Sequence, residues 1–581
     1  MDGWIVDSRP SRRYPIYTRA NVGEVFPDPV TPLSATFGIS MEAEPGWRDA
    51  FERFGVVELD EYDPDNNEVI GVFGGYCYLN VTLSRIVGVR TPGLTPEMID
   101  AAFFGTQPGV PPYQPQSTDE RPDLTAKVGA TLQWILTTPD LPELMADQER
   151  METLRDERPD LSELADEELV ARGRRLMGQH FRGLFAEHIF ITYCATVPTG
   201  ILQQAAAAAG DPTLAMKLIA GVGDVESAQP SMLMWDLGRM AAASPSLTAA
   251  FEEGPEGLAA RIDVLSGQGD EDVEHFVKAF EAFLHEHGCR GPNEWETRSP
   301  TWETHPDLAL AAIDRMRVSP ASAAPRALQA QRSAEREALG QGLVAALAGD
   351  PEAQGQVQAA LHASTIFLAG RERSKTNAIR LVHECRVALR ELGRRMVERG
   401  IFEHPGEYGM LREDELDAFL ADPAAMAPEL RRREAEYQEL RHLEPPFVFE
   451  GDPPPMDQWP RRDERPVAVA VPGETLQGVP GCPGRARGVA RVVTNSHDPG
   501  ALEPGDVLVA EITDPSWTPL FVPSAAVVVN VGAPLSHAII VSRELGIPCV
   551  VSVTDATRRI PDGALVEVDG DLGTVTIVDG A

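Results

Sequence analysis

The chain has 581 residues, enough for roughly two to four domains, with 89 Asp and Glu against 51 Lys and Arg and a formal net charge of −38. Such an acidic surface argues against nucleic acid or an anionic membrane as a partner. The N-terminal segment lacks the apolar core of a signal peptide. No apolar run approaches the ~18 residues of a membrane-spanning helix, so a cytoplasmic location is expected.

The cysteines and lysines exclude several kinds of site. The six cysteines are scattered singly without a Cys-x-x-Cys pair, which is typical of reduced thiols and not of structural zinc. Only four lysines occur, Lys127, Lys217, Lys278 and Lys375, and none follows a glycine as in a phosphate-binding loop. No segment has the pattern of a nucleotide-grasping domain or of a phosphoenolpyruvate-binding barrel.

Residues 1–445 are predicted to be mainly helical. The first ~125 residues are rich in Pro and Gly, with a possible small sheet in residues 67–80. Apolar residues then recur at three-to-four spacing, which predicts amphipathic helices whose apolar stripes form core, in residues 161–190, 273–288, 378–400 and 428–443.

A change of composition marks the C-terminal region. Residues 446–476 form a Pro-rich segment that predicts a semi-stiff linker without regular structure. The following residues, 477–581, predict a small β/α domain with strand patterns in 486–493, 506–512, 525–531, 549–553, 564–570 and 574–579. Residues 512–521 between two of these patterns are expected to form a loop, because Pro515 and Pro519 exclude a central strand.

One helix in this region carries a histidine at its start. In GAPLSHAIIVSRELGIP, residues 532–548, Ser536 is a good N-cap, His537 follows it, and Gly546 ends a helix of about ten residues. An imidazole there lies among free backbone N–H groups at the positive end of the helix dipole, which suits a phosphoryl group. A histidine that only caps or packs is the alternative.

The motif resembles the phosphohistidine site of the phosphoenolpyruvate-utilising enzymes, including the rifampicin phosphotransferases. Their sites read approximately G-G-x-T-S/C-H-A, then an apolar run and A-R-E-x-G-I-P. Here Ala533 replaces the second Gly, and Leu535 replaces a hydroxyl residue, a change that the rifampicin branch tolerates. The resemblance implies a swivelling phosphohistidine domain in which His537 is the nucleophile and Gly532 and Ser536 belong to the phosphate-site loop.

Three phrases before residue 446 resemble the substrate-binding region of the same family. In residues 18–34 the resemblance assigns Glu24 to substrate binding. In residues 285–306 it assigns Arg290 and Glu294, although a structural ion pair that pins this loop is the alternative. His285 and His287 lack a third ligand, so no metal site is expected.

The third phrase, residues 370–381, contains Arg371 and Lys375 on one helix face. Phosphoryl transfer needs cations around the migrating group, and the resemblance assigns this pair to that role. A surface charge cluster with Glu372 and Arg373 is the alternative.

The expected fold is therefore multidomain, with a mainly α-helical large domain and a C-terminal β/α swivelling phosphohistidine domain. The expected function is a phosphotransferase subunit that carries phosphate on His537 to a hydroxyl of a small organic acceptor. ATP and Mg²⁺ are expected on a separate ATP-grasp subunit, with AMP and phosphate released, and no cofactor on this chain alone. The acceptor is a phenol of the phenylphosphate synthase type or a rifamycin-type antibiotic. A non-catalytic phosphorelay or regulatory protein is the alternative.

Overall fold

The computed structural model describes residues 4–104, 109–211, 213–223, 225–462, 467–494, 502–532 and 536–578. The chain folds into two compact units. The first comprises Met1–Ala195, Trp295–Ser299 and Arg373–Pro466; the second comprises Thr196–Glu294, Pro300–Glu372 and Val467–Ala581. This division differs from the boundaries expected at 445 and 477. Hydrophobic periodicity locates elements along the chain but does not tell which elements share a core.

The first unit combines helices with a small antiparallel sheet. Its strands are β1 Ile16–Thr18, β2 Ile70–Phe73, β3 Tyr76–Asn80 and β4 Val448–Glu450, in the order β2-β3-β1-β4. The sheet expected in residues 67–80 is confirmed as the β2–β3 hairpin. Its helices are α1 Val22–Val25, α2 Glu44–Phe54, α3 Val81–Arg90, α4 Pro96–Phe104, α5 Thr125–Thr137, α6 Pro142–Asp156, α7 Asp166–Leu176, α17 Leu416–Ala421 and α18 Pro423–Arg441.

Residues 446–476, predicted to form an irregular linker, contain short regular elements, although most of the described residues of this segment are irregular. Strand β4 pairs with β1, and the Phe449 ring stacks on Tyr17 with their centroids 5.5 Å apart. A short 3₁₀ helix, Met456–Gln458, follows, and Thr475–Gln477 forms strand β5 of the second unit. Proline disfavours central strands, but β4 contains no proline and lies at an edge of its sheet, where flanking prolines are tolerated.

Most helices of the second unit precede the sheet in sequence. They are α9 Leu214–Leu218, α10 Gln229–Ala243, α11 Pro245–Glu252, α12 Leu258–Ser266, α13 Glu271–His287, α14 Pro306–Val318 and α15 Pro325–Ala346. Two long helices, α8 Arg182–Ala208 and α16 Pro351–Glu398, contain residues of both units. The four periodic segments are confirmed as helical, by α7 and α8, by α13, by α16 and by α18. No helix among the described residues is both long and apolar enough to cross a membrane.

The C-terminal part of the second unit is built on an eight-stranded mixed sheet in the order β5-β12-β11-β7-β8-β9-β10-β6. All six predicted strands are present: β7 Arg485–Val493, β8 Val507–Ala510, β9 Ala526–Val529, β10 Cys549–Val551, β11 Leu565–Asp569 and β12 Thr574–Ile577. Strands β7 to β10 are parallel neighbours. Helix α19 Thr518–Phe521 connects β8 to β9, helix α20 His537–Leu545 connects β9 to β10, and helix α21 Ala556–Arg559 lies between β10 and β11. The edge strands β5 and β6 Val479–Cys482 were not predicted, because they are short and β6 contains Pro480 and Gly481.

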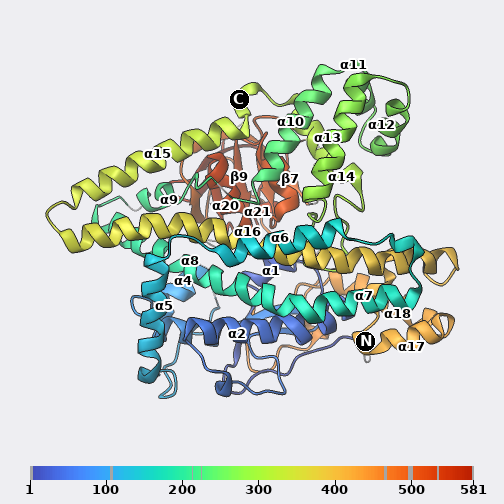
Figure 1. The fold of residues 1–581 in the computed structure, drawn as a ribbon. Coiled ribbons are helices and arrows are strands. Elements are labelled where there is room, and N and C mark those ends of the chain that lie inside the picture. Colours follow the sequence, from blue (N-terminus) through green and yellow to red (C-terminus); the bar gives the residue numbers. More distant parts are fainter. Residues whose placement is uncertain are drawn as a thin grey trace. The chain divides into compact units, whose positions relative to one another are not determined.

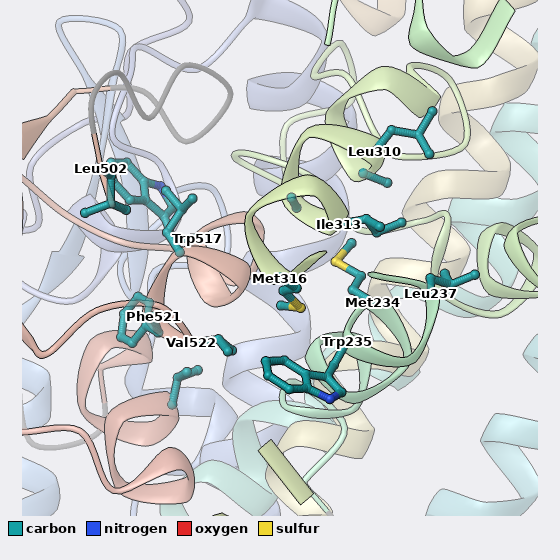
Figure 2. Packing of buried hydrophobic residues seen from close by; sticks show 14 of the residues in the cluster. Met234, Trp235, Leu237, Leu310, Ile313, Met316, Leu502, Trp517, Phe521 and Val522 are labelled. Atoms are coloured by element: carbon teal, nitrogen blue, oxygen red, sulfur yellow. The ribbon is translucent and has the colours of Figure 1, made fainter. Parts of the chain in front are cut away.

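The sheet shares a hydrophobic core with the helices of its own unit (Figure 1). Alternate strand residues face opposite sides, so that Val527 and Val529 of β9 lie in this core while Val528 lies in the core on the other face. Figure 2 shows Trp517, Phe521 and Val522, from the segment after β8, in one cluster with Met316 of α14 and Trp235 of α10. The β/α region therefore packs on the helical part of the second unit as one hydrophobic body. The mainly helical fold with a C-terminal β/α domain is confirmed.

Candidate active site

The candidate site lies at one edge of the parallel part of the sheet. Strands β8 and β9 are parallel neighbours, so the segments that leave their carboxyl ends meet at the same edge. Backbone hydrogen bonds tie these segments together, from Asn530 N to Ala510 O at 3.0 Å and from Val531 N to Glu511 O at 3.1 Å. This pairing brings the residues after Glu511 next to the start of helix α20.

His537 is the first residue of α20, as predicted, and both of its ring nitrogens contact threonine hydroxyls. The Nε2 atom lies 3.0 Å from Thr518 Oγ1, and the Nδ1 atom lies 3.2 Å from Thr513 Oγ1. The edge of the ring packs against Phe521, with the centroids 5.8 Å apart. The imidazole is partly exposed, whereas both threonines are buried. A hydroxyl can donate to an unprotonated ring nitrogen or accept from a protonated one, so this arrangement accommodates either neutral tautomer.

The two threonines were not predicted as site residues. The segment expected to be a loop, residues 512–521, forms a 3₁₀ turn at Pro515–Trp517 followed by α19, with Pro519 in its first turn. Proline is compatible with the first turn of a helix, so its exclusion from a strand did not require a loop. The only signal in the sequence was that each threonine shortly precedes a proline, Thr513 before Pro515 and Thr518 before Pro519. Turn formation explains that pattern equally well.

The start of α20 depends on close packing around Gly532. A Cβ atom on this residue would lie 2.8 Å from the Cβ atom of Val551, and the Gly532 carbonyl accepts a hydrogen bond from Ser552 Oγ at 2.6 Å. Ser536 occupies the N-cap position as predicted, but its buried hydroxyl makes no hydrogen bond among the described residues. Leu535, where the resembled motif has a hydroxyl residue, lies outside the described residues, as does Ala533.

A partly buried acidic residue connects this site to the loop after α13. Asp514 Oδ2 accepts a hydrogen bond from the backbone N–H of Asn293 at 3.0 Å, and Asp514 Oδ1 accepts from Ser516 N at 2.8 Å and Ser516 Oγ at 2.5 Å. Burial raises the pKa of Asp514, an effect that these hydrogen bonds oppose. The carboxylate therefore fixes the turn that carries Thr513.

Arg290 and Glu294 form a buried ion pair, with Nη1 and Oε1 3.1 Å apart and side chains only 2% exposed. Burial lowers the pKa of Arg290, but the Glu294 carboxylate outweighs this effect, so the net shift is upward. The geometry matches the structural alternative, a pair that pins the loop; the predicted role in substrate binding stays a prediction.

The other predicted residues are distributed between the units. Arg371 lies in the second unit and forms an ion pair of 2.5 Å with Glu372. Lys375 lies one turn further along α16, in the residues assigned to the first unit, and Glu24 lies in α1 of that unit. No group of three His, Cys, Asp or Glu side chains suited to a metal ion occurs among the described residues.

Comparison with protein families identifies two regions of the chain. Residues 185–372 match the model of the rifampicin phosphotransferase fourth domain, and residues 502–573 match the mobile domain of PEP-utilising enzymes. The second match contains His537, Thr513 and Thr518. The first covers most of the helices that share the second unit with the sheet.

Individual proteins are also similar to this chain in sequence. An uncharacterized protein of Mycobacterium tuberculosis is 36% identical over 320 residues, 55% of this chain and 33% of the relative. A rifampicin phosphotransferase of Streptomyces sviceus is 30% identical over 332 residues, 55% of this chain and 37% of the relative. The prodigiosin synthesizing transferase PigC of Serratia marcescens is 30% identical over 308 residues, 52% of this chain and 33% of the relative. The chain spans about a third of the length of these relatives. Two regions of the chain, residues 185–372 and 502–573, are therefore similar to domains of rifampicin phosphotransferases and of PEP-utilising enzymes.

Proposed function

We propose that the chain is a phosphotransferase subunit that carries a phosphoryl group on His537 to a hydroxyl of a small organic acceptor. The observation that supports this most directly is the position of His537. It begins α20 between the hydroxyls of Thr513 and Thr518, inside the region that matches the mobile domain of PEP-utilising enzymes. A partly exposed imidazole with both nitrogens oriented by hydroxyls is suited to nucleophilic catalysis.

The phosphate donor in this proposal is Mg²⁺-ATP on a separate ATP-grasp subunit. A ring nitrogen of His537 attacks the β-phosphorus, the bond between that phosphorus and the oxygen of the α-phosphate breaks, and AMP leaves. Water then cleaves the β–γ phosphate linkage and releases inorganic phosphate, so that one phosphoryl group stays on His537. The N–P bond then breaks as the acceptor oxygen attacks, and the acceptor proton passes to solvent or to a base. Loading requires the attacking ring nitrogen to be unprotonated, and the hydroxyl on the other nitrogen accepts the ring N–H and fixes the tautomer.

Several groups of this chain would stabilise a phosphoryl group on His537. A phosphoryl group on one ring nitrogen displaces the hydroxyl in contact there, and that hydroxyl can then donate to a phosphoryl oxygen. The free N–H groups and the positive dipole at the start of α20 further favour the negative charge. Arg371 and Lys375 are proposed to neutralise the migrating group, and Arg290, Glu294 and Glu24 to contact the acceptor.

The class of acceptor is suggested by the relatives. Two of them are named for transferring phosphate to rifampicin or for synthesising prodigiosin, which are small organic molecules. A phenol or an antibiotic hydroxyl therefore remains the proposed acceptor. A phenol would need little help from a general base, whereas an aliphatic alcohol would need one.

Transfer of ³²P from β-labelled ATP tests the proposal. With a purified ATP-grasp partner present, the chain should take up one acid-labile, alkali-stable phosphate, and His537→Ala should take up none. His275→Ala, which changes an exposed histidine of α13, should label as the unchanged protein does. Label retained by His537→Ala would show that another residue carries the phosphate.

A second experiment tests the proposed division between subunits. The chain alone lacks a glycine-lysine phosphate loop, so calorimetry with Mg²⁺-ATP should give no heat of binding. Micromolar affinity for the chain alone would contradict the separate donor subunit and would direct attention to residues 1–130.

A further inference from the structure

A cavity lies in the second unit, near the other end of α20 from His537. Its volume is about 240 Å³, and all the residues that line it belong to the second unit. His537 and Arg543 are six residues apart on α20, about 9 Å along the helix axis. The lining includes Lys217 of α9, Arg332 and Glu335 of α15, Arg543, Asp571 and the turn Cys482–Gly484.

Arg543 is the unusual member of this lining. Its side chain is 2% exposed, and its Nε and Nη1 atoms are buried without a hydrogen-bond partner among the described residues. Burial lowers the pKa of this guanidinium to about 10, and the charge of Glu544 only partly opposes the effect. A buried cation without a partner is strongly unfavourable, so Arg543 occupies a position that an anion would stabilise.

The neighbouring charges leave an excess of positive charge in the cavity. Arg332 is already neutralised, since its Nη1 lies 2.8 Å from Glu335, and its Nη2 donates to Gly546 O at 3.2 Å. Asp571 accepts from the Gly484 N–H at 3.3 Å. Lys217 lies near enough to Asp211 for its charge to contribute to lowering the pKa of that carboxyl, but the Lys217 ammonium makes no hydrogen bond or ion pair within the part of the chain that the structure describes.

We propose that this cavity binds a small oxyanion, namely phosphate or a small phosphate monoester. The guanidinium of Arg543 offers a charged donor to a tetrahedral anion, and the Lys217 ammonium supplies a further cation. The volume is smaller than the ~300–1,000 Å³ of pockets for drug-sized ligands, so a nucleotide does not fit.

Two features separate this site from the one at His537. The last turn of α20 carries free carbonyls and the negative end of the dipole, so the anion is held by side chains and not by backbone N–H groups. Burial raises the pKa of the Cys482 thiol to about 12, so the thiol stays protonated and the site binds its ligand without a covalent bond.

Thermal unfolding in inorganic phosphate, at ionic strength held constant with chloride, tests the site. A ligand that binds only the folded state raises the unfolding midpoint, so the midpoint of the unchanged protein should rise with phosphate. Arg543→Met keeps the volume but removes the guanidinium, and should abolish the rise. Lys217→Met should weaken the apparent affinity by about tenfold, a loss of one charge-assisted contact. Lys278→Met, at an exposed position on α13, is the matched control and should leave the affinity unchanged.

The His537→Ala variant distinguishes this site from the proposed phosphoryl site. The phosphate-dependent rise should persist in that variant, and its loss would show that phosphate binds at His537 instead. An equal rise in chloride, or a rise retained by Arg543→Met, would overturn the proposal. If Arg543→Met fails to fold, an affinity unchanged by Lys217→Met would overturn it. A second titration, with glycerol 3-phosphate in place of inorganic phosphate, identifies the class of ligand. Tighter binding of glycerol 3-phosphate than of phosphate indicates a phosphate monoester, and weaker binding indicates free phosphate.

Discussion

The side chain of His537 is oriented by two hydroxyls that come from one short segment. Thr513 precedes the turn at Pro515–Trp517, and Thr518 follows it, so the turn places one hydroxyl on each ring nitrogen. The resembled motif has its hydroxyl two residues before the histidine, where this chain has Leu535. We infer that Thr513 and Thr518 provide the hydroxyl function in this protein.

Removal of these hydroxyls should slow the loading of His537. Thr518→Val and Thr513→Val each keep the volume but delete one contact of about 0.5–1.5 kcal/mol, so each should reduce the rate about twofold to tenfold. The rate of ³²P uptake from β-labelled ATP, with the ATP-grasp partner present, measures the effect. Thr137→Val, at an exposed helical position, is the control. Unchanged rates in both site variants would mean that the hydroxyls do not orient the ring.

The thiols give a test of folding that does not depend on the proposed activity. All six cysteines are buried, and burial raises the pKa of Cys482 and Cys549 to about 12, against about 8.5 in an unfolded chain. At pH 8 the folded protein should therefore resist iodoacetamide, and the unfolded chain should take up six labels, as counted by intact mass. Because the folded pKa is raised, stability should fall as the pH rises above about 8.5. Rapid labelling of one or two thiols in the folded protein would contradict this packing.

The residues of the site differ in how far the sequence could predict them. His537, Gly532 and Ser536 are contiguous, and helix-start chemistry together with the motif located them. Thr513 and Thr518 reach His537 only because β8 and β9 are adjacent and parallel, an ordering that no local pattern encodes. Arg290 and Glu294 were correctly recognised as a possible pair, because an i, i+4 spacing is itself local.

At the scale of helices and strands, elements with a strong local sequence pattern were predicted, and elements with a weak pattern were missed. The six C-terminal strands contain β-branched runs, and the long helices have clear apolar periodicity, so both were predicted. Strands β4, β5 and β6 have only three or four residues each and lie at sheet edges, where pairing with a distant partner decides the structure. Strand β4, inside the predicted linker, was missed for the same reason, since it forms by pairing with the distant strand β1.

The turn before α20 should be sensitive to a single added methyl group. Gly532→Ala would place a Cβ atom 2.8 Å from Val551 Cβ, so the β10 strand or the turn must shift, at a cost of about 1–3 kcal/mol. Gly355→Ala in α16 is the matched control, because nothing lies within 4 Å of its added Cβ and alanine favours a helix. Urea unfolding should show a lower midpoint for the first variant and an unchanged or higher one for the second. Equal midpoints would show that the turn relaxes freely.

At the scale of the whole molecule, the shared core of the second unit bears on the proposed carrier mechanism. Trp517 and Phe521 pack with Met316 and Trp235 in one hydrophobic cluster (Figure 2). If His537 visits a donor subunit and then an acceptor, the β/α region must leave this cluster in at least one of the two half-reactions. Exposing such a cluster is unfavourable, so the packed arrangement should predominate in the absence of partners.

A disulfide that joins α14 to α19, which pack against each other within the second unit, tests this motion. The locked protein should not be loaded by ATP and the partner subunit, because the β/α region cannot move to the donor. Protein phosphorylated before locking should still transfer its phosphate to the acceptor. The same variant under reducing conditions is the control. Equal loading of locked and reduced forms would rule out a swinging carrier.

Each unit is assembled from three separate stretches of the chain, and this arrangement constrains how the protein is made. The first unit needs residues up to Pro466, and the second needs residues up to Ala581. During synthesis at about 5–20 residues per second, the N-terminal stretch waits for partners that emerge much later. Most of its long-range contacts must therefore form late, and no single truncation of this chain yields either unit alone, without segments of the other. A ribosome-bound nascent chain of this protein is consequently expected to depend on chaperones until its last residues have been added.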